Sequence, residues 1–194
     1  MYSIFATHYY TMKERIELYP ELFEYYPSNG IIEIYNCVNR IDSDFESLLR
    51  VCRFFAAEGK HCVILPKSLH RKSQEYCLVF GKLFGTKYDG KCPDLWIDGV
   101  FYEHEGHISK NGKKAFRNMM NRGLAQSSRI IIEDCNVTYS FILSSILGRQ
   151  MIGIEIEELW ALNQQEVKLL YKSEGQHSHA APVFNESVES LARK

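Results

Sequence analysis

The stretch that decides the fold is Cys92-Pro93-Asp94-Leu95-Trp96-Ile97-Asp98-Gly99-Val100-Phe101-Tyr102-Glu103-His104-Glu105. Asp98-Gly99 is a strong signal for a two-residue turn, and apolar and aromatic residues flank it on both sides. The stretch therefore predicts a β-hairpin. Because side chains alternate between the two faces of a strand, we expect Glu103 and Glu105 on one face and His104 on the other.

Acidic side chains gather on this hairpin. Asp94 stands at the entry of the first predicted strand, while Glu103 and Glu105 share a face of the second. Carboxylates grouped in this way can bind a divalent metal or transfer protons. The alternative is an edge hairpin whose polar face is solvated, because antiparallel sheets often expose one face to water.

A basic stretch follows the hairpin directly. From Gly106 to Ile132 the chain contains no Asp or Glu, although its formal net charge as a whole is only −1. Because Lys and Arg supply most contacts to phosphates, this local charge predicts that a polyanion is held near the carboxylates. The alternative is a solvated helix face. The cations assigned to this stretch are Lys110, Lys113, Lys114, Arg117, Arg122 and Arg129.

The pattern before the hairpin predicts alternating helix and strand. Apolar residues at helical spacing predict a helix over 45–58 that Gly59 ends, and a strand over 61–65 follows at once. The β-branched run 31–38 reads as another strand. The pattern leaves two alternatives for the Tyr-rich segment before Pro27, a short helix or an arm for a partner.

The pattern after the hairpin continues the alternation. Ser109 is a candidate cap for a helix that runs to about Gln126, and the apolar run at 129–134 predicts a strand in the sheet interior. Residues 152–162 and 167–172 predict a closing hairpin. The fold class is therefore α/β (α+β), with a single central mixed β-sheet flanked by helices.

Length and composition set the domain organisation. The 194 residues predict an N-terminal segment over 1–42, one main domain over 43–172 and a flexible polar tail over 173–194. No apolar run approaches the roughly 20 residues of a membrane span, and no secretory signal is evident, so we expect a cytoplasmic protein that does not contact a membrane. Six cysteines without a close pair predict buried, reduced thiols rather than a zinc site.

Three segments resemble a known family: Ala56–Pro66, Pro93–Glu103 and Leu124–Ile132. They look like the C-terminal nuclease domains of contact-dependent growth-inhibition toxins. They are also similar to the related barnase/EndoU/colicin/RelE-like toxin domains of phage and mobile elements. The resemblance covers roughly Asp44 to Tyr171. It implies a nuclease-like fold and a hydrolase that cleaves RNA, often tRNA.

The resemblance implies metal-free acid/base cleavage, in which the 2′-hydroxyl of RNA is the nucleophile and no cofactor is required. Glu103 or His104 would be the base and His107 the acid, with Glu105 in the same group. Gln126 would hydrogen-bond across the site or cap the helix end. The cations that would hold the scissile phosphate are Lys113, Lys114 and Arg117.

The hairpin also resembles the Pro-Asp…(Asp/Glu)-x-Lys motif of restriction nucleases. In that motif Asp94 and Glu103 would be the acids that bind Mg²⁺, and the position of the catalytic lysine is occupied by Glu105. A glutamate cannot offset anionic charge. Either a lysine of the basic helix (Lys110, Lys113 or Lys114) substitutes for it, or the metal mechanism is absent.

Weaker candidates lie outside the hairpin. Asp134 ends a predicted buried strand, where α/β proteins often collect polar groups, although it can equally cap the helix that begins near Thr138. Glu46 on the first helix is a further acidic candidate.

Two functions of different classes follow. The first is an RNA nuclease of the toxin type, with DNA as a second substrate class. The second is a catalytically inactive module of a mobile element that binds nucleic acid or protein, which Glu105 and the near-neutral charge favour. In either case the N-terminal Tyr-rich segment could be an arm for a protein partner. The chain has no phosphate-binding Gly-rich loop, dinucleotide fingerprint, serine elbow or zinc-protease helix, which disfavours those enzyme classes.

Overall fold

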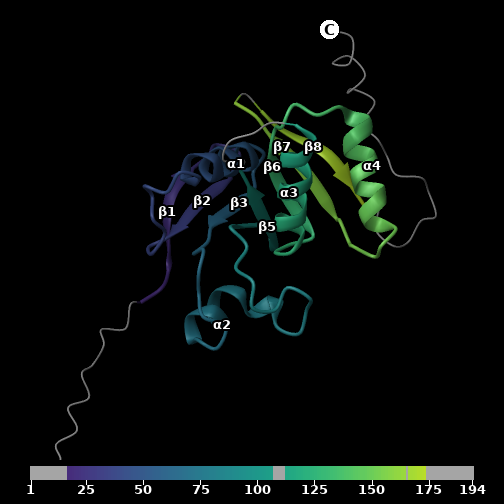
Figure 1. Cartoon of the computed structure of the whole chain (residues 1–194). Helices are drawn as coiled ribbons and strands as arrows, with labels where there is room; N and C mark the ends of the chain where they lie inside the picture. The colour runs from purple at the N-terminus through teal and green to yellow at the C-terminus, as the bar shows by residue number, and fades with distance from the viewer. Residues whose placement is uncertain (1–16, 107–111, 165, 174–194) are drawn as a thin grey trace, which may run out of the picture.

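The hairpin forms the middle of one eight-stranded mixed sheet in the computed structural model, which describes residues 17–106, 112–164 and 166–173. The strands follow sequence order from β1 to β8 across the sheet (Figure 1). The predicted α/β class is therefore confirmed. The strands are β1 (Pro20–Tyr25), β2 (Ile31–Tyr35), β3 (His61–Ile64), β4 (Leu95–Ile97), β5 (Val100–Glu105), β6 (Arg129–Glu133), β7 (Glu158–Leu162) and β8 (Val167–Lys172).

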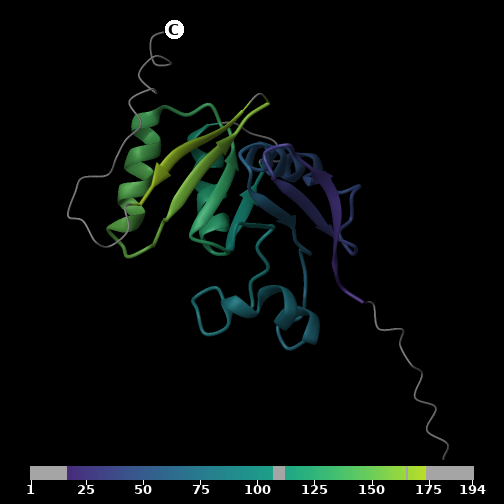
Figure 2. The ribbon, with the colours of Figure 1, turned by 180° about the vertical axis from the view of Figure 1, so that it is seen from behind.

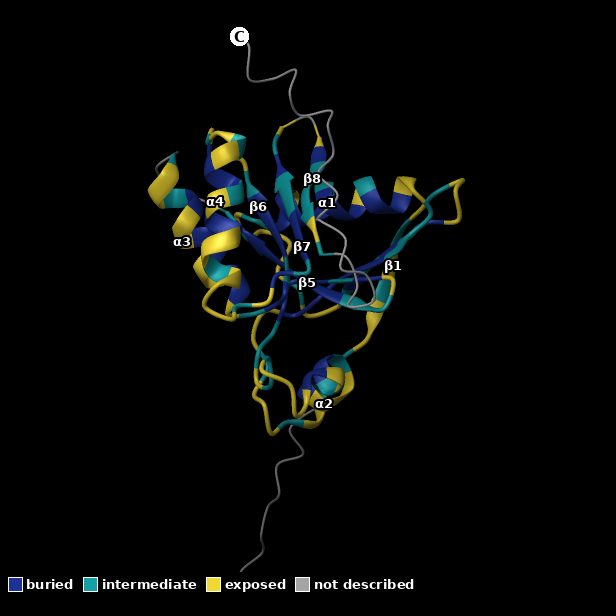
Figure 3. Ribbon diagram, turned by 90° about the vertical axis from the view of Figure 1, so that its right-hand side faces the viewer, coloured by how far each residue is buried: buried dark blue, intermediate teal, exposed yellow. Residues whose placement is uncertain are grey.

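Helices cover both faces of this sheet. Helix α1 (Phe45–Ala57) packs on one face, and α3 (Lys113–Leu124) and α4 (Tyr139–Gln150) pack on the other. Figure 3 shows the sheet between these two helical layers. Helix α2 (Gln74–Phe80) and the short 3₁₀ turn η1 (Gly81–Leu83) form a lobe beside the sheet, which Figures 1 and 2 show from opposite sides.

The turn of the hairpin follows from two residues. Asp98 and Gly99 both have positive φ, at 45° and 95°, which is the backbone of a type I′ turn. Leu95 lies opposite Tyr102 and Ile97 opposite Val100, so the predicted hairpin is confirmed with its register. The alternative of a solvated polar face is wrong, because α3 lies over the strand and both Glu103 and Glu105 are buried.

Three apolar clusters hold the layers together. Alternate strand residues face opposite sides, so Ile131 packs under α1 while its neighbours Ile130 and Ile132 pack under α3 and α4. A third cluster joins α2 to the sheet through Phe80 and Phe101. Burial of such side chains stabilises the fold by about 2 kcal/mol each, which makes these contacts the main source of stability.

Several element boundaries differ from the prediction. Helix α3 begins at Lys113, because Gly112 before it has φ 100°, which lies outside the helical region. The predicted cap Ser109 lies outside the described residues. Strand β7 begins at Glu158 rather than 152, because Met151 to Gly153 form a turn that closes α4. The Tyr-rich segment contributes β1, which pairs with β2 and extends the sheet.

The cysteines are free, as expected for reduced thiols. Cys52, Cys62 and Cys135 are buried, but Cys37 and Cys77 are exposed, so the expectation of burial is wrong for these two. Within the described residues, no helix has the length and apolar character that a membrane span requires.

Candidate functional site

The parallel strands end at one common edge of the sheet. Strands β2 and β3 are parallel, as are β5, β6 and β7, and two antiparallel steps through β4 give β5 the direction of β3. Strand β4 runs the other way, so Asp94, which precedes it, lies at the same edge as the end of β5. Ligands of open α/β sheets bind at the carboxyl ends of the strands. We call this the carboxyl edge.

Asp94 and Glu103 form an acid pair at the carboxyl edge. Because Leu95 pairs with Tyr102, Asp94 and Glu103 are the next neighbours across the hairpin. Their exposed fractions are only 8% and 7%. Asp94 Oδ2 accepts a hydrogen bond from the backbone N–H of His104 at 3.1 Å. Glu103 Oε2 is buried and has no hydrogen-bond partner among the described residues.

Burial changes the ionisation of this pair. It raises the pKa of Asp94 to about 7, although the His104 N–H acts in the opposite direction. Burial raises the pKa of Glu103 to about 10, and the negative charges of Asp94 and Glu105 add to this increase. Both carboxyls therefore keep protons to a higher pH than usual, and the pair retains a proton at neutral pH. Two carboxyls with well-separated pKa values can serve as an acid and a base.

Glu105 continues the acidic strand but has a cationic partner. Arg122 of α3 donates from Nε to Glu105 Oε2 at 2.8 Å and from a terminal nitrogen to the Gly106 carbonyl at 3.0 Å. Burial raises the pKa of Glu105, and Arg122 opposes that increase. Arg122 comes close because Gly123 has no side chain: a Cβ there would lie 3.3 Å from Glu105 Cγ. Two cations therefore act on the acids: Arg122 on Glu103 and Glu105, and Lys67 on Asp94.

His104 points to the opposite face, as the alternation predicted. It is 5% exposed, and its Nε2 has no hydrogen-bond partner among the described residues. Burial lowers its pKa, while the carboxylates of Glu133 and Asp44 act against this. His104 is therefore neutral at pH 7. Its side chain lies on the α1 side of β5, so the sheet separates it from the side chain of Glu103.

A second group of polar side chains, Ser47, Arg50 and Glu133, lies at the carboxyl edge on the α1 face. Ser47 Oγ donates to Glu133 Oε1 at 3.1 Å, and Arg50 donates to Ser47 Oγ at 3.2 Å and to the Asn163 carbonyl at 2.9 Å. Sequence reasoning missed Glu133. Its position at the end of an apolar strand was a usable signal, but that argument selected its neighbour Asp134.

The remaining acidic candidates have local roles or lie in solvent. Asp134 Oδ1 accepts from the Asn136 N–H at 2.9 Å, which forms a tight turn before α4 rather than a helix cap. Glu46 is exposed. Asp44 binds Lys67 Nζ at 2.6 Å beside the acid pair, and Lys67 also contacts Asp42.

The cationic side chains of α3, the predicted basic helix, lie on different sides of the helix. Lys113 and Arg117 lie over the ring of Phe141, at 5.3 Å and 5.0 Å, and therefore face α4 rather than the acids. Lys114 is exposed. Of these four α3 cations, it is Arg122 that contacts the acidic strand. The predicted site residues His107 and Lys110 lie outside the described residues.

Gln126 lies at the other end of the sheet. It follows α3 and precedes β6, so it borders a cavity of about 550 Å³ at the amino ends of the strands together with Ser128 and Arg129. Its amide oxygen is buried without a partner among the described residues. The fold does not bring it to the acid pair.

The carboxylate oxygens of Asp94 and Glu103 are the type of ligand that Mg²⁺ binds. Within the described residues, no group of three or more His, Cys, Asp or Glu side chains has the geometry of a metal site. Mg²⁺, however, commonly takes one or two carboxylates and completes its shell with water and substrate phosphate. The unpartnered Oε2 of Glu103 is an oxygen donor of the required type.

Comparisons with known proteins find no relative of the chain. No family model matches the chain, and neither the curated proteins nor the solved structures contain a match to it.

Proposed function

We propose that this chain is a nuclease-like domain that cleaves RNA by acid/base catalysis at the Asp94–Glu103 pair. The observation that carries the proposal is the difference in partners within this buried pair. Asp94 accepts a hydrogen bond from the His104 N–H, which favours its ionised form. Glu103 Oε2 has no partner among the described residues, and the neighbouring acids favour the protonated form of Glu103. The pair therefore holds one carboxylate and one carboxylic acid. General acid/base catalysis requires these two forms together.

The proposed reaction begins with a proton transfer. The Asp94 carboxylate accepts the proton of a ribose 2′-hydroxyl, and the 2′-oxygen forms a bond to the adjacent phosphorus. The bond from phosphorus to the 5′-oxygen breaks, and Glu103 donates its proton to that leaving oxygen. The products are a 2′,3′-cyclic phosphate and a free 5′-hydroxyl. Arg122 is the α3 cation that can offset charge developing on the phosphate.

Asp94 and Glu103 are also the residues that would hold Mg²⁺ in the restriction-nuclease alternative. A bound ion would supply positive charge at the scissile phosphate and activate water. Asp94 and Glu103 would then act as ligands in their ionised forms, which requires the ion to lower both pKa values. This alternative extends the substrate to DNA, because it does not need a 2′-hydroxyl.

The test is cleavage of total RNA with magnesium or with EDTA. We expect cleavage in EDTA, a loss of about 10²- to 10⁴-fold in rate for Glu103→Gln, and wild-type rates for Glu158→Gln. Glu158 is the matched control because it is buried in the same sheet. The rate should rise as Asp94 ionises near pH 7 and fall as Glu103 loses its proton near pH 10. Products ending in 2′,3′-cyclic phosphate would identify the 2′-hydroxyl route.

Each other outcome has a definite meaning. Cleavage that requires magnesium and also occurs on DNA would replace acid/base chemistry with the metal alternative at the same residues. Intact RNA under all conditions would reject the enzyme and favour the second candidate, a non-catalytic binding module. The pairing of Arg122 with Glu105 favours that candidate, because it occupies the α3 cation that contacts the acidic strand. Assignment to a toxin domain of a mobile element rests on the sequence resemblance, and a cytoplasmic location rests on the cysteines that the sequence predicts to be reduced.

A further inference from the structure

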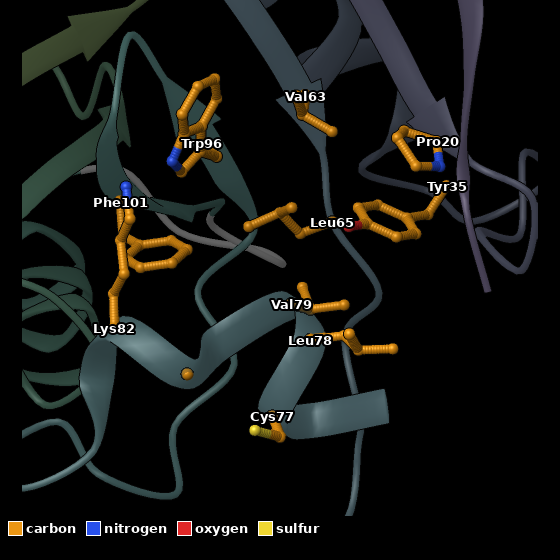
Figure 4. A pocket seen from close by; sticks show the side chains of 11 residues that line it. Pro20, Tyr35, Val63, Leu65, Cys77, Leu78, Val79, Lys82, Trp96 and Phe101 are labelled. Carbon is orange, nitrogen blue, oxygen red and sulfur yellow. The ribbon is translucent and has the colours of Figure 1, made fainter. Parts of the chain in front are cut away.

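An apolar groove of about 360 Å³ lies between helix α2 and the sheet. Figure 4 shows Val63 and Leu65 of the β3 segment in its centre, Trp96 of β4 on one side and Tyr35 of β2 on the other. Val79 of α2 approaches from the helix side. The groove is therefore bounded by two aromatic side chains that come from different strands.

The groove leaves two of its aromatic side chains partly exposed. Trp96 and Tyr35 are half-buried against the α2 cluster, and the rings of His61 and Trp96 meet edge to face. Phe101, in contrast, is buried inside that cluster against Phe80. Lys82 Nζ lies 5.8 Å from the centre of the Trp96 ring, at the rim of the groove. An aromatic surface with a cation beside it is the arrangement that binds single-stranded nucleic acid through stacking and phosphate contact.

The lobe that closes the groove carries positive charge. Residues 66–93 contain six Lys and Arg and two Asp and Glu, a net charge of +4, while the whole chain has −1. The rest of the chain is therefore net negative. Within the lobe, three cations are paired with carboxylates: Lys67 with Asp42 and Asp44, Arg71 with Asp89, and Lys87 with Glu155. The cation of the lobe that lines the groove is Lys82. The net charge of the lobe complements a polyanion, and Lys82 is placed to contact a phosphate at the groove. The charged residues of the lobe are Lys67, Arg71, Lys72, Lys82, Lys87, Lys91, Glu75 and Asp89.

The groove adjoins the acid pair. Leu65 lines the groove, and its N–H donates to the Asp94 carbonyl at 2.9 Å. Phe101 also lines the groove, on the same strand face as Glu103 and two residues before it, which is about 7 Å along the strand. Asp94 and Glu103 do not line the groove themselves, so a nucleotide with its base there would reach them by extending its sugar and phosphate past Phe101.

We propose that this groove binds a base of single-stranded RNA, with Trp96 and Tyr35 stacking on the base and Lys82 contacting a phosphate. The proposal rests on the proposed function, because it makes the groove the subsite that positions RNA for the acid pair. Trp96 and Tyr35 are then binding residues that contact the substrate away from the reacting atoms.

The test is equilibrium binding of a fluorescein-labelled, unstructured 12-nucleotide RNA with 2′-O-methyl sugars, in EDTA at low salt. The methyl groups remove the nucleophile, so binding is measured without cleavage. A second probe has the same backbone without bases. We expect Trp96→Leu and Tyr35→Leu each to raise the Kd of the first probe about tenfold or more, whereas the control Tyr25→Leu leaves it unchanged. Tyr25 is an exposed tyrosine of β1 outside the groove.

The second probe separates stacking from charge. It should bind more weakly, and the groove variants should leave its Kd within about twofold of wild type, while Lys82→Gln weakens both probes. Equal Kd values for wild type and both groove variants would overturn the proposal, as would an equal loss for both probes or no binding of the first probe at low salt. If Trp96→Leu does not fold, which circular dichroism would show, Tyr35→Leu decides alone.

The groove and the nuclease proposal can fail separately. Cleavage of ordinary RNA together with unchanged Kd values in the groove variants would reject the groove and retain the nuclease. Binding that depends on Trp96 and Tyr35 without any cleavage would retain the groove and reject the nuclease.

Discussion

Two buried glutamates of one sheet behave in opposite ways. Glu103 at the carboxyl edge and Glu158 at the start of β7 have exposed fractions of 7% and 8%. Burial raises the pKa of Glu103 to about 10, and its Oε2 has no partner among the described residues. Burial also acts to raise the pKa of Glu158, but hydrogen bonds from Trp160, Tyr102 and Lys172 outweigh it and leave that pKa below its usual value.

Hydrogen-bond partners and neighbouring charges, rather than burial alone, determine whether a buried carboxyl is ionised. Glu158 accepts hydrogen bonds from the Tyr102 hydroxyl at 2.7 Å and from the Trp160 indole at 2.9 Å. Together with the ion pair to Lys172, these bonds satisfy its charge and link β5, β7 and β8. Glu103 has acidic neighbours instead, and keeps a proton that it can donate. A carboxylate with satisfied hydrogen bonds stabilises structure, whereas a protonated carboxyl with an unpartnered oxygen is available for chemistry.

The largest expected effect on stability is at Glu158. Glu158→Leu should lower the free energy of unfolding by about 3 kcal/mol at pH 7, because it leaves the buried Tyr102 hydroxyl and Trp160 N–H without their acceptor. Glu103→Leu should cost less, about 1 kcal/mol, since Oε2 makes no hydrogen bond and the substitution removes only the backbone hydrogen bond from Asp94. Urea unfolding of both variants measures this. Equal losses would remove the distinction between the two glutamates.

The next effect is the pH dependence of stability. An acid whose folded pKa lies above its unfolded value stabilises the fold below the unfolded pKa, and this contribution is lost as pH rises through the folded pKa. Asp94 should therefore reduce stability between about pH 4 and 7, and Glu103 between about pH 4.5 and 10. At pH 9, Glu103→Gln should exceed wild type by about 1–3 kcal/mol.

The matched measurement is thermal unfolding at pH 5, 7 and 9. Glu158→Gln should show the reverse trend, with its deficit relative to wild type largest at neutral and alkaline pH, because the lowered pKa of Glu158 stabilises only the ionised protein. A wild-type Tm that does not fall from pH 5 to 9, relative to that of Glu103→Gln, would contradict the raised pKa values of the acid pair.

A smaller effect is expected where α3 contacts the acidic strand. Gly123→Ala should destabilise by about 1–2 kcal/mol, because its Cβ would lie 2.9 Å from Ile130 Cγ2 and 3.3 Å from Glu105 Cγ. Gly148→Ala in α4 has open space around its Cβ and should stabilise by up to about 1 kcal/mol. Chemical denaturation of the two variants compares them. Stabilisation by both would show that α3 can move away from the acids without cost.

The smallest effect concerns ion pairs. A double-mutant cycle with Arg122→Met and Glu105→Gln should give a coupling of about 1 kcal/mol, because Glu105 is buried. The more exposed pair of Arg53 with Glu24 should give about 0.5 kcal/mol or less in the equivalent cycle. Both cycles are measured by urea unfolding. A larger coupling at Arg53 would argue that α3 does not enclose Glu105 in solution.

Local features of the fold were predictable because they depend on neighbours in sequence. Asp98-Gly99 predicted the turn, the alternation predicted opposite faces for His104 and the glutamates, and the apolar spacing predicted α1. The boundary errors arose where tertiary contact or one backbone angle overrode the pattern. Gly112 delays the start of α3, and β1 forms only because β2 offers it an edge.

The candidate site was only partly predictable. The acidic group at Asp94, Glu103 and Glu105 was identified from the hairpin, but the partner of each acid was not. Arg122 lies 17 residues from Glu105, and Ser47 lies 86 residues from Glu133. No local pattern selected these pairs over Lys113 or Asp134, since chain spacing does not say which side of a helix meets which strand.

The sequence by itself determined the hairpin, its register and the face of each acidic side chain, because turn chemistry and strand alternation act over a few residues. Only the tertiary structure shows that α3 covers Glu103 and Glu105 and that Arg122 binds Glu105. It also shows that Trp96 and Tyr35 border one groove. These contacts depend on packing between distant segments. The pKa of a carboxyl depends on the water that such packing removes and on the charges that it brings near.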